Sequence, residues 1–354
     1  MNFPVARPNN ENSPGTGPRS GQGLLGKARN PFWLAPMAGI TDVCFRHLLD
    51  EMGAGVLVSE LVSAKGLLYH SRKTRRMMRI HPDPVAPVGI QLFGESAEDI
   101  IDAARIVKEE GASFIDINLG CPVRKVVKKG CGAALMRDPG YLEKFLSRIK
   151  QGIDLPLTVK MRTGWSDEEI TIHQCVQAAY NAGCEWVVIH GRTRTQGYGG
   201  NADWDLIREV KQQAKLPIIG NGDIRTAERA RDRLQDTGVD AVMIGRGALR
   251  NPWIFLECTH QPGRGKISPL DLISRYLEGL SEFYEPRVTL ILLRKFSAWL
   301  AYGYPGAAAF RRNMFLLNNA GQVMQCADEF FANVASHPVP AFDDAEPFMM
   351  AGHG

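Results

Sequence analysis

Apolar residues occur along the chain in short runs that recur at regular intervals from Pro31 onward. Each run is five or six residues long and shows no strict alternation of polar and apolar positions. Such runs are typical of parallel strands that are buried on both faces. The runs cover residues 32–37, 56–60, 88–92, 114–118, 157–161, 186–190, 217–221 and 241–245.

Helix start and stop signals lie between these runs. Ser96 is placed to cap a helix that ends at Gly111, and Ser166 with Glu169 has the spacing of a capping box for a helix that ends at Gly183. Eight strand–helix units in roughly 230 residues is the count of a (β/α)8 TIM barrel. A doubly wound sheet is disfavoured, because no glycine-rich turn follows the first run.

The pattern changes after Pro252, where helical spacing continues and no further strand is predicted. Helices are expected over residues 270–283, 288–302, 307–317 and 322–334. We therefore predict an α/β protein, a TIM barrel followed by a C-terminal all-helical domain. The expected division is a disordered leader over 1–26, a barrel over 27–260, a helical domain over 266–336 and a flexible tail over 337–354.

Composition adds limits rather than a function. The chain has 354 residues, of which 44% are hydrophobic and 23% charged, as in ordinary globular proteins. No apolar run is long enough to cross a membrane, and no secretory signal is recognisable. The seven cysteines form no CxxC pair and no metal-ligand spacing, so we expect no metal. Their odd number and the lack of a signal favour a reducing cytoplasmic setting, and no protein partner is implied.

Basic residues are clustered although the net charge is only +4. One cluster lies within residues 72–79, a second within 124–129, and Arg311 and Arg312 form a pair in the predicted helical domain. A local basic patch attracts a polyanion even when the whole protein is nearly neutral. The simpler interpretation of each cluster is a solvated helix face.

Polar or charged residues follow nearly every predicted strand at its carboxyl end. Active sites of (β/α)8 barrels lie at this end, and isolated polar groups there are costly unless they are paired. The residues are Gln91, Asn118, Lys160, Arg162, His190, Arg192, Asn221, Gly222, Asp223, Gly245 and Arg246.

The last two strands predict a phosphate site. Gly222 and Gly245 allow backbone N–H groups to approach an anion, and Arg246 adds positive charge. The alternative is that both glycines only form tight turns.

Lys160 and Gln91 indicate a second part of the same ligand. A buried lysine needs an electron-rich partner, and amide groups suit the edge of a flavin ring. A salt bridge from Lys160 to Asp116 or Glu60 is the alternative.

Cys121 is the most informative single residue. It lies on the loop after the fourth strand, before Pro122, and the basic cluster within residues 124–129 favours a reactive thiol. An inert loop cysteine is the alternative. Cys131 is the one rival, and its neighbours Gly130 and Gly132 indicate close packing instead.

Six motifs together resemble the tRNA-dihydrouridine synthases, most closely the bacterial B subfamily. They are APMAGITD at 35–42, DINLGCP at 116–122, KMRTGW at 160–165, HGRTR at 190–194, NGD at 221–223 and MIGR at 243–246. The resemblance runs in order from about residue 31 to residue 330 and covers both predicted domains.

The resemblance implies an enzyme in which NADPH reduces FMN and the C5=C6 bond of a D-loop uridine in tRNA is then reduced. Cys121 matches the family's catalytic cysteine, which donates the proton to C5. It implies RNA contacts for Arg162, Arg192, Arg311 and Arg312. The implied flavin contacts are Pro36, Met37, Gln91, Asn118, Lys160, His190, Asn221, Gly222, Asp223, Gly245 and Arg246.

Two other functions remain open at this point. A flavin barrel that reduces a free pyrimidine would share the same site but would not need the basic helical domain. A catalytically silent RNA-binding protein would not need Cys121 or Lys160.

Overall fold

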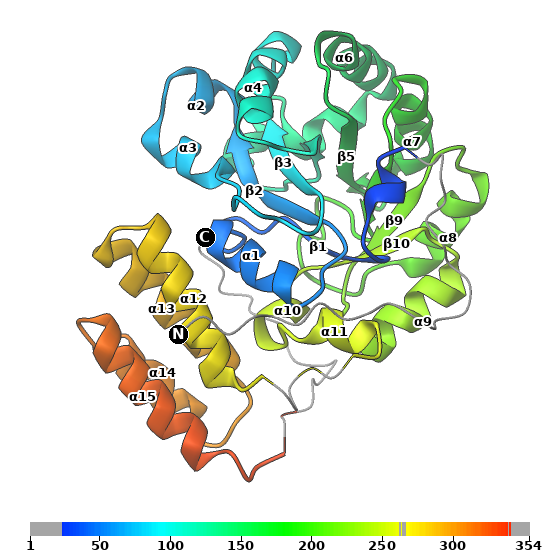
Figure 1. Ribbon diagram of the computed structural model, residues 1–354. Coiled ribbons are helices and arrows are strands. Elements are labelled where there is room, and N and C mark those ends of the chain that lie inside the picture. The colour runs from blue at the N-terminus through cyan, green and yellow to red at the C-terminus, as the bar shows by residue number, and fades with distance from the viewer. Residues whose placement is uncertain (1–22, 262, 264–266, 339, 341–354) are drawn as a thin grey trace.

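Eight parallel strands form a barrel at the centre of the structure (Figure 1). The structure is a computed structural model, and it describes residues 23–261, 263, 267–338 and 340. The strands fall in the predicted apolar runs, where side chains are buried on both faces. They are β1 (Phe32–Leu34), β2 (Leu57–Ser63), β3 (Val88–Phe93), β4 (Phe114–Leu119), β5 (Leu157–Arg162), β8 (Val187–His190), β9 (Ile218–Asn221) and β10 (Ala241–Ile244).

The strand order is β1-β10-β9-β8-β5-β4-β3-β2, so each strand pairs with its neighbours along the chain except at β1. There the barrel closes through two backbone hydrogen bonds just before β2. Gly55 N donates to Phe32 O at 2.7 Å, and Leu34 N donates to Val56 O at 2.9 Å. The predicted (β/α)8 barrel is confirmed.

Helices cover the outside of the barrel and follow the strands in sequence (Figure 1). Most begin at a side-chain cap, as Asp42, Ser96, Asp203 and Thr226 show. The helices are α1 (Val43–Glu51), α2 (Ala64–Leu68), α3 (Arg72–Met78), α4 (Ala97–Glu109), α5 (Arg124–Val127), α6 (Pro139–Gly152), α7 (Ile172–Asn181), α8 (Trp204–Gln213), α9 (Ala227–Thr237), α10 (Gly247–Arg250) and α11 (Ile254–Cys258), with 3-10 turns η1 (Leu25–Lys27) and η2 (Gly132–Arg137).

One predicted helix start is wrong. Ser166 and Glu169 do not cap α7 but lie in a small antiparallel hairpin formed by β6 (Gly164–Ser166) and β7 (Glu169–Ile170). The Glu169 carboxylate accepts two hydrogen bonds from the Arg137 guanidinium, at 2.8 and 3.2 Å, so it is not available to the backbone. The helix begins only at Ile172.

Aromatic rings close the N-terminal end of the barrel. Trp33 and Trp186 pack with their ring centroids 4.8 Å apart, and the Phe114 ring meets Trp186 edge-on at 5.1 Å. A Cβ on Gly89 would lie 2.1 Å from the Phe114 ring, so only glycine leaves room for this plug. Leu24, 3% exposed, belongs to the same apolar cluster. The leader predicted for 1–26 lies outside the described residues up to 22, and ordered structure begins before its predicted end.

The C-terminal helices pack beside α1 and α10 (Figure 1). They are α12 (Pro269–Phe283), α13 (Pro286–Leu300), α14 (Ala307–Met314) and α15 (Ala320–Asn333). A capping box between Ser268 and Asp271 opens the first of them. The Tyr276 hydroxyl on α12 donates to the Asp42 carboxylate at 2.8 Å, which ties this region to the barrel. None of the helices described here is long and apolar enough to span a bilayer.

Candidate active site

The side chains expected to bind a ligand gather at the carboxyl ends of the strands, as the barrel fold requires. Gln91, Asn118 and Lys160 come from β3, β4 and β5, and His190 and Asn221 from β8 and β9. Direct hydrogen bonds join several of them across the barrel, as the next paragraphs describe. This end of the barrel is called the mouth below.

Cys121 is held at the mouth through its backbone. Its N–H donates to Asn118 Oδ1 at 2.9 Å, and the Asn118 amide N donates to Gln91 Oε1 at 2.8 Å. Gln91 Nε2 in turn donates to an oxygen of Asp116 at 2.7 Å. The loop that carries the thiol is therefore connected to a buried carboxylate inside the barrel.

The thiol itself has a raised pKa. Burial is the main cause, and the backbone N–H of Val123 and the charge of Arg162 oppose it only in part. The expectation that the basic cluster within residues 124–129 activates the thiol is wrong, because burial outweighs nearby positive charge. A thiol with a raised pKa is protonated at neutral pH and can donate a proton.

Lys160 has a pKa lowered to about 7. Burial is the largest cause and the charge of Arg162 adds to it, whereas Asp116 acts in the opposite direction. Lys160 Nζ donates to Asn221 Oδ1 at 2.8 Å, so its hydrogen-bond partner is an amide rather than a carboxylate of Asp116 or Glu60. An anionic or electron-rich ligand at the mouth would restore the charged form.

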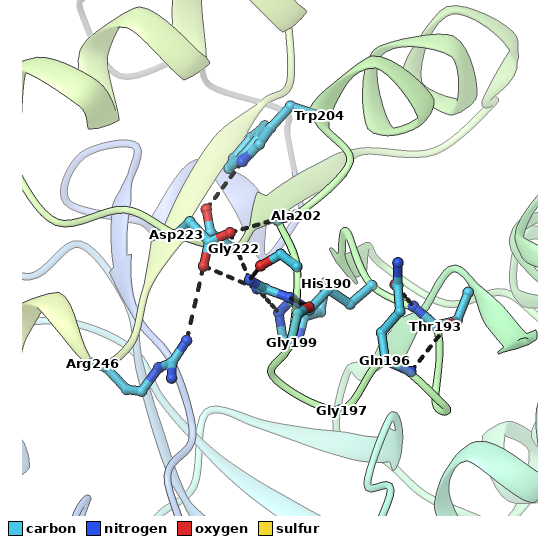
Figure 2. Close-up of polar contacts among 12 residues, drawn as sticks. His190, Thr193, Gln196, Gly197, Gly199, Ala202, Trp204, Gly222, Asp223 and Arg246 are labelled. Atoms are coloured by element: carbon cyan, nitrogen blue, oxygen red, sulfur yellow. Dashed lines mark hydrogen bonds and ion pairs between the residues drawn. The ribbon is translucent and has the colours of Figure 1, made fainter. Parts of the chain in front are cut away.

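Asp223 is the centre of a second network at the mouth (Figure 2). Both of its oxygens accept from Arg192, each at 2.9 Å, and Ala202 N donates to it at 2.7 Å. Arg246 lies 3.8 Å from the same carboxylate. Asp223 has a φ of +49° and follows Gly222 at +139°, a backbone path that favours glycine and tolerates aspartate.

Arg162 and Arg192 hold the loop after β8. Arg162 donates to the carbonyls of Gly120, Thr193 and Gly197, each at 2.8 Å. Arg192 donates to the carbonyls of Gly199 and Gly200, as well as to Asp223. Both arginines are 2% exposed. Their predicted contact with RNA stays a prediction, and in the structure they shape the loop and the mouth.

The loop after β8 carries Tyr198, which is 54% exposed. Arg246 lies 4.7 Å from its ring centroid and Arg162 lies 5.9 Å from it. The ring therefore covers cationic groups at the mouth.

Positive charge exceeds negative charge at the mouth. Burial lowers the pKa of His190 well below its usual value, and four cations, Lys160, Arg162, Arg192 and Arg246, lower it further. Asp223 pairs with Arg192 and lies 3.8 Å from Arg246, and the charge of Asp116 acts on Lys160 without a hydrogen bond between them. A neutral histidine among desolvated cations fits a site for an anionic ligand, and Gly222, Gly245 and Arg246 lie where a phosphate is expected.

The remaining predicted residues lie near or away from this group. Pro36 and Met37 follow β1, and the Met37 sulfur would lie 3.7 Å from a Cβ on Gly245. Arg311 and Arg312 lie on α14, away from the strand ends. Arg311 covers one ring face of Tyr302 at 5.1 Å, and Arg250 of the barrel lies 3.3 Å from the same ring centroid.

Three features of the site were missed in the sequence. Asp116 was considered only as a salt-bridge partner, although a charged residue inside an apolar strand run was a signal of a buried polar contact. Thr158, which donates to Asp116 at 2.7 Å, carries no such signal. The loop carbonyls that accept from Arg192 could not be found, because backbone acceptors have no residue signature.

Comparisons with known proteins agree with these features. A family model described as "Dihydrouridine synthase (Dus)" matches residues 33–335. The chain is 38% identical over 314 residues to tRNA-dihydrouridine synthase B of Escherichia coli (strain K12), which covers 87% of this chain and 98% of that protein. It is 37% identical over 308 residues to a protein of Rickettsia conorii named "Probable tRNA-dihydrouridine synthase", covering 85% of this chain and 93% of that protein.

Solved structures share the fold at low sequence identity. Histamine dehydrogenase from Rhizobium sp. 4-9 has a TM-score of 0.51 at 13% identity, covering 71% of this chain and 49% of that chain. A 2-naphthoyl-CoA reductase in complex with 2-naphthoyl-CoA has a TM-score of 0.53 at 13% identity, covering 66% and 51%. Both matches bear on the fold alone.

Proposed function

The chain belongs to the dihydrouridine synthase family of flavin-dependent oxidoreductases, and we propose that it reduces the C5=C6 bond of a D-loop uridine in tRNA, with FMN as cofactor and NADPH as hydride donor. One observation carries the proposal. Cys121, whose thiol has a pKa raised by burial, is fixed at the barrel mouth by the hydrogen bond from its N–H to Asn118, and the basic side chains Lys160, Arg162, Arg192 and Arg246 lie at the same end. A reduction that adds a hydride and a proton across a double bond needs a hydride donor and a proton donor, and FMN as the hydride carrier needs a site for its phosphate.

The residues at the mouth fit FMN. Gly222, Gly245 and Arg246 would hold its phosphate, because backbone N–H groups and a guanidinium are the usual phosphate donors in such barrels. Lys160 would face the electron-rich edge of the ring, which accounts for a lysine whose pKa is lowered to about 7 and whose one side-chain partner among the described residues is an amide. Gln91 and Asn118 would supply amide groups to the ring.

FMN held by these residues would supply hydride-transfer chemistry, taking a hydride from NADPH and giving one to C6 of the uracil ring. Cys121 supplies the proton to C5, and the thiolate that remains takes a proton from solvent. The raised pKa of the thiol suits this role, because a general acid must be protonated before the reaction. The overall change is uridine, NADPH and a proton to dihydrouridine and NADP⁺.

Asn118 positions the donor. Its side-chain oxygen accepts from the Cys121 N–H at 2.9 Å and from the Gly120 N–H at 3.3 Å, which fixes the turn that carries the thiol. Arg162 holds the same turn through the Gly120 carbonyl. Proton transfer depends on such fixed geometry.

The proposed substrate is tRNA. A base within folded RNA must leave its stack before it can enter the mouth, so the protein must also hold the surrounding RNA. Arg311 and Arg312 on α14 would contact phosphates, together with Arg72 and Lys73 on α3, whose side chains are exposed. Part of the α3 cluster serves another purpose. Arg76 lies 3.5 Å from Glu285 and Arg79 donates to the Phe283 carbonyl, which ties the barrel to the C-terminal helices.

The test is to separate the two half-reactions with Cys121→Ala. Stopped-flow reduction of the flavin by NADPH is expected to proceed at nearly the wild-type rate, because no proton transfer to uracil is involved. Reoxidation by unmodified tRNA is expected to slow by about 10²–10⁴, the usual contribution of a positioned general acid.

Cys131→Ala is the matched control. Cys131 is 2% exposed and lies next to the Cys121 loop, where Ala133 N donates to the Cys121 carbonyl at 3.4 Å. It is expected to leave both half-reactions nearly unchanged. Equal tRNA-dependent reoxidation in wild type and Cys121→Ala would remove Cys121 from the mechanism, and a large loss in Cys131→Ala would move the role to that residue.

A further inference from the structure

A continuous line of side-chain hydrogen bonds runs from inside the barrel to the turn that carries Cys121. Thr158 Oγ1 donates to Asp116 Oδ1 at 2.7 Å, and Gln91 Nε2 donates to Asp116 Oδ2 at 2.7 Å. Asn118 Nδ2 donates to Gln91 Oε1 at 2.8 Å, and Asn118 Oδ1 accepts from the Cys121 N–H. These side chains are called the amide relay below.

Every bond of the amide relay is donated toward Asp116, from Thr158 on one side and from Cys121 through Asn118 and Gln91 on the other. Burial raises the pKa of the Asp116 carboxyl to about 6, against the hydrogen bonds from Gln91 and Thr158, so above this pH it is ionised. An ionised carboxylate can only accept, so Gln91 must turn its N–H₂ toward Asp116 and its oxygen toward Asn118. Asn118 must then turn its N–H₂ toward Gln91, which leaves its oxygen for the backbone N–H of Cys121. If one amide were turned over, two donors or two acceptors would face each other at each of its contacts.

Burial prevents water from replacing any of these hydrogen bonds, so their direction is fixed. Asp116 is 2% exposed and Gln91 is 1% exposed, so protein atoms must satisfy these groups. Asp116 lies on β4 and pairs in register with Gln91 of β3 and Thr158 of β5, which places all three side chains on one level of the barrel. Among the side chains of the relay, the carboxylate is the one that cannot exchange donor for acceptor by rotation, and the Cys121 N–H at the other end is a fixed donor that agrees with it.

We propose that Asp116 is a positioning residue that sets the direction of the amide relay and thereby fixes the Cys121 turn. Its consequence for catalysis rests on the proposed function, whereas its consequence for the turn does not. The same direction leaves the second N–H of Asn118 without an acceptor among the described residues, so the relay also decides that this amide offers a donor, not an acceptor, to a ligand.

The test is to break the relay and then to reverse it as a whole. Asn118→Asp keeps an oxygen for the Cys121 N–H but opposes its second oxygen to Gln91 Oε1. Gln91 cannot relieve this by turning over, because its oxygen would then face Asp116. The variant is expected to lower Tm by several degrees and to raise the rate of Cys121 alkylation by iodoacetamide, measured by mass spectrometry on flavin-free protein, by roughly tenfold.

The double variant Asp116→Asn with Asn118→Asp moves the carboxylate to the other end of the relay. Gln91 can then donate to position 118 and accept from position 116, so all bonds form again in reverse. Most of the loss in Tm and most of the gain in alkylation rate are expected to be recovered. If Asn118→Asp alone does not yield folded protein, recovery of folding in the double variant supports the proposal in the same way.

Thr158→Val combined with Asn118→Asp is the matched control, because it alters the same carboxylate contact without moving the charge. It is expected to recover nothing.

The proposal is overturned if the double variant is no more stable than Asn118→Asp, or if the Thr158→Val control recovers as much. Neither readout depends on turnover. A failure of Cys121 as proton donor would therefore appear only in the half-reaction experiment and would leave the alkylation and Tm results unchanged.

Discussion

The barrel mouth and the C-terminal helices are held together by opposite means. At the mouth, charged groups such as Arg192 and Asp223 are withdrawn from water and paired with each other. Between α14 and α15, the Phe310 and Phe330 rings stack with centroids 4.2 Å apart, and Phe331 meets both. Desolvated charges contribute little net stability, whereas buried rings contribute much of it.

The difference shows which region is arranged for chemistry. A mouth selected only for stability would contain apolar residues of similar volume, because buried ion pairs are often replaced by them without loss. The C-terminal helices are stabilised by buried apolar side chains, and the arginines proposed to contact RNA, Arg311 and Arg312, lie outside that apolar core. The two regions should therefore respond differently to substitution.

The largest effect on stability is expected from Phe310→Ala. Phe310 is 5% exposed, and loss of a buried phenylalanine ring costs about 3–5 kcal/mol because a cavity remains. Hydrogen exchange of α14 and α15 should rise, while reduction of the flavin by NADPH should be unchanged. Phe315→Ala, at a 54% exposed position just beyond the same helix, should change stability by about 0.5 kcal/mol or less. A loss of flavin reduction in Phe310→Ala would contradict the separation of the two regions.

A smaller effect is expected from Asp223→Ala, which leaves Arg192 without its carboxylate. The Arg192 side chain is 3% exposed, so its unpaired charge should lower the free energy of unfolding by about 3 kcal/mol and loosen the loop after β8. Glu98→Ala breaks another two-bond arginine–carboxylate pair, with Arg148, but at an exposed position where it should cost about 0–1 kcal/mol. Equal costs in urea denaturation would mean that burial does not distinguish the two pairs.

The smallest effect is a pH dependence that Lys160 gives to the mouth. Its pKa is lowered from 10.5 to about 7 in the folded protein, so between these values the unfolded chain holds a proton that the folded chain has released. The free energy of unfolding of flavin-free protein should therefore rise with pH in this window, by at most about 1.4 kcal/mol per pH unit. Lys160→Met should remove this part of the slope. Parallel stability curves from pH 7 to pH 9 would show that Lys160 does not titrate in this window.

The sequence predicted the strands well because a parallel strand buried on both faces has an unmistakable apolar run. It placed the ends less well. The run over residues 32–37 continues three residues beyond β1, since apolar residues also line the loop at the mouth. The hairpin of β6 and β7 was missed because Ser166 and Glu169 satisfy a helix-capping pattern until Arg137, distant in sequence, binds the glutamate.

The sequence predicted which residues lie at the strand ends, but it did not predict which side chains contact each other. The fold brings the strand ends to one place, and there Gln91 contacts Asn118 and Lys160 contacts Asn221. The environment of Cys121 was predicted wrongly, since neighbouring basic residues in the sequence say nothing about burial. Pairing between side chains, such as Arg192 with Asp223, depends on rotamers and loop paths that no local pattern encodes.

The aromatic plug at the opposite end of the barrel has a kinetic consequence. Trp33, Phe114 and Trp186 seal that end, so in the described part of the chain the mouth is the way into the barrel interior. If NADPH and tRNA both react at a cofactor held there, they must use one doorway in turn. A single entrance makes binding of the two substrates mutually exclusive, so the oxidised nucleotide must dissociate before the RNA binds. Steady-state velocities at several fixed tRNA concentrations should then give parallel double-reciprocal lines, the pattern of a ping-pong enzyme.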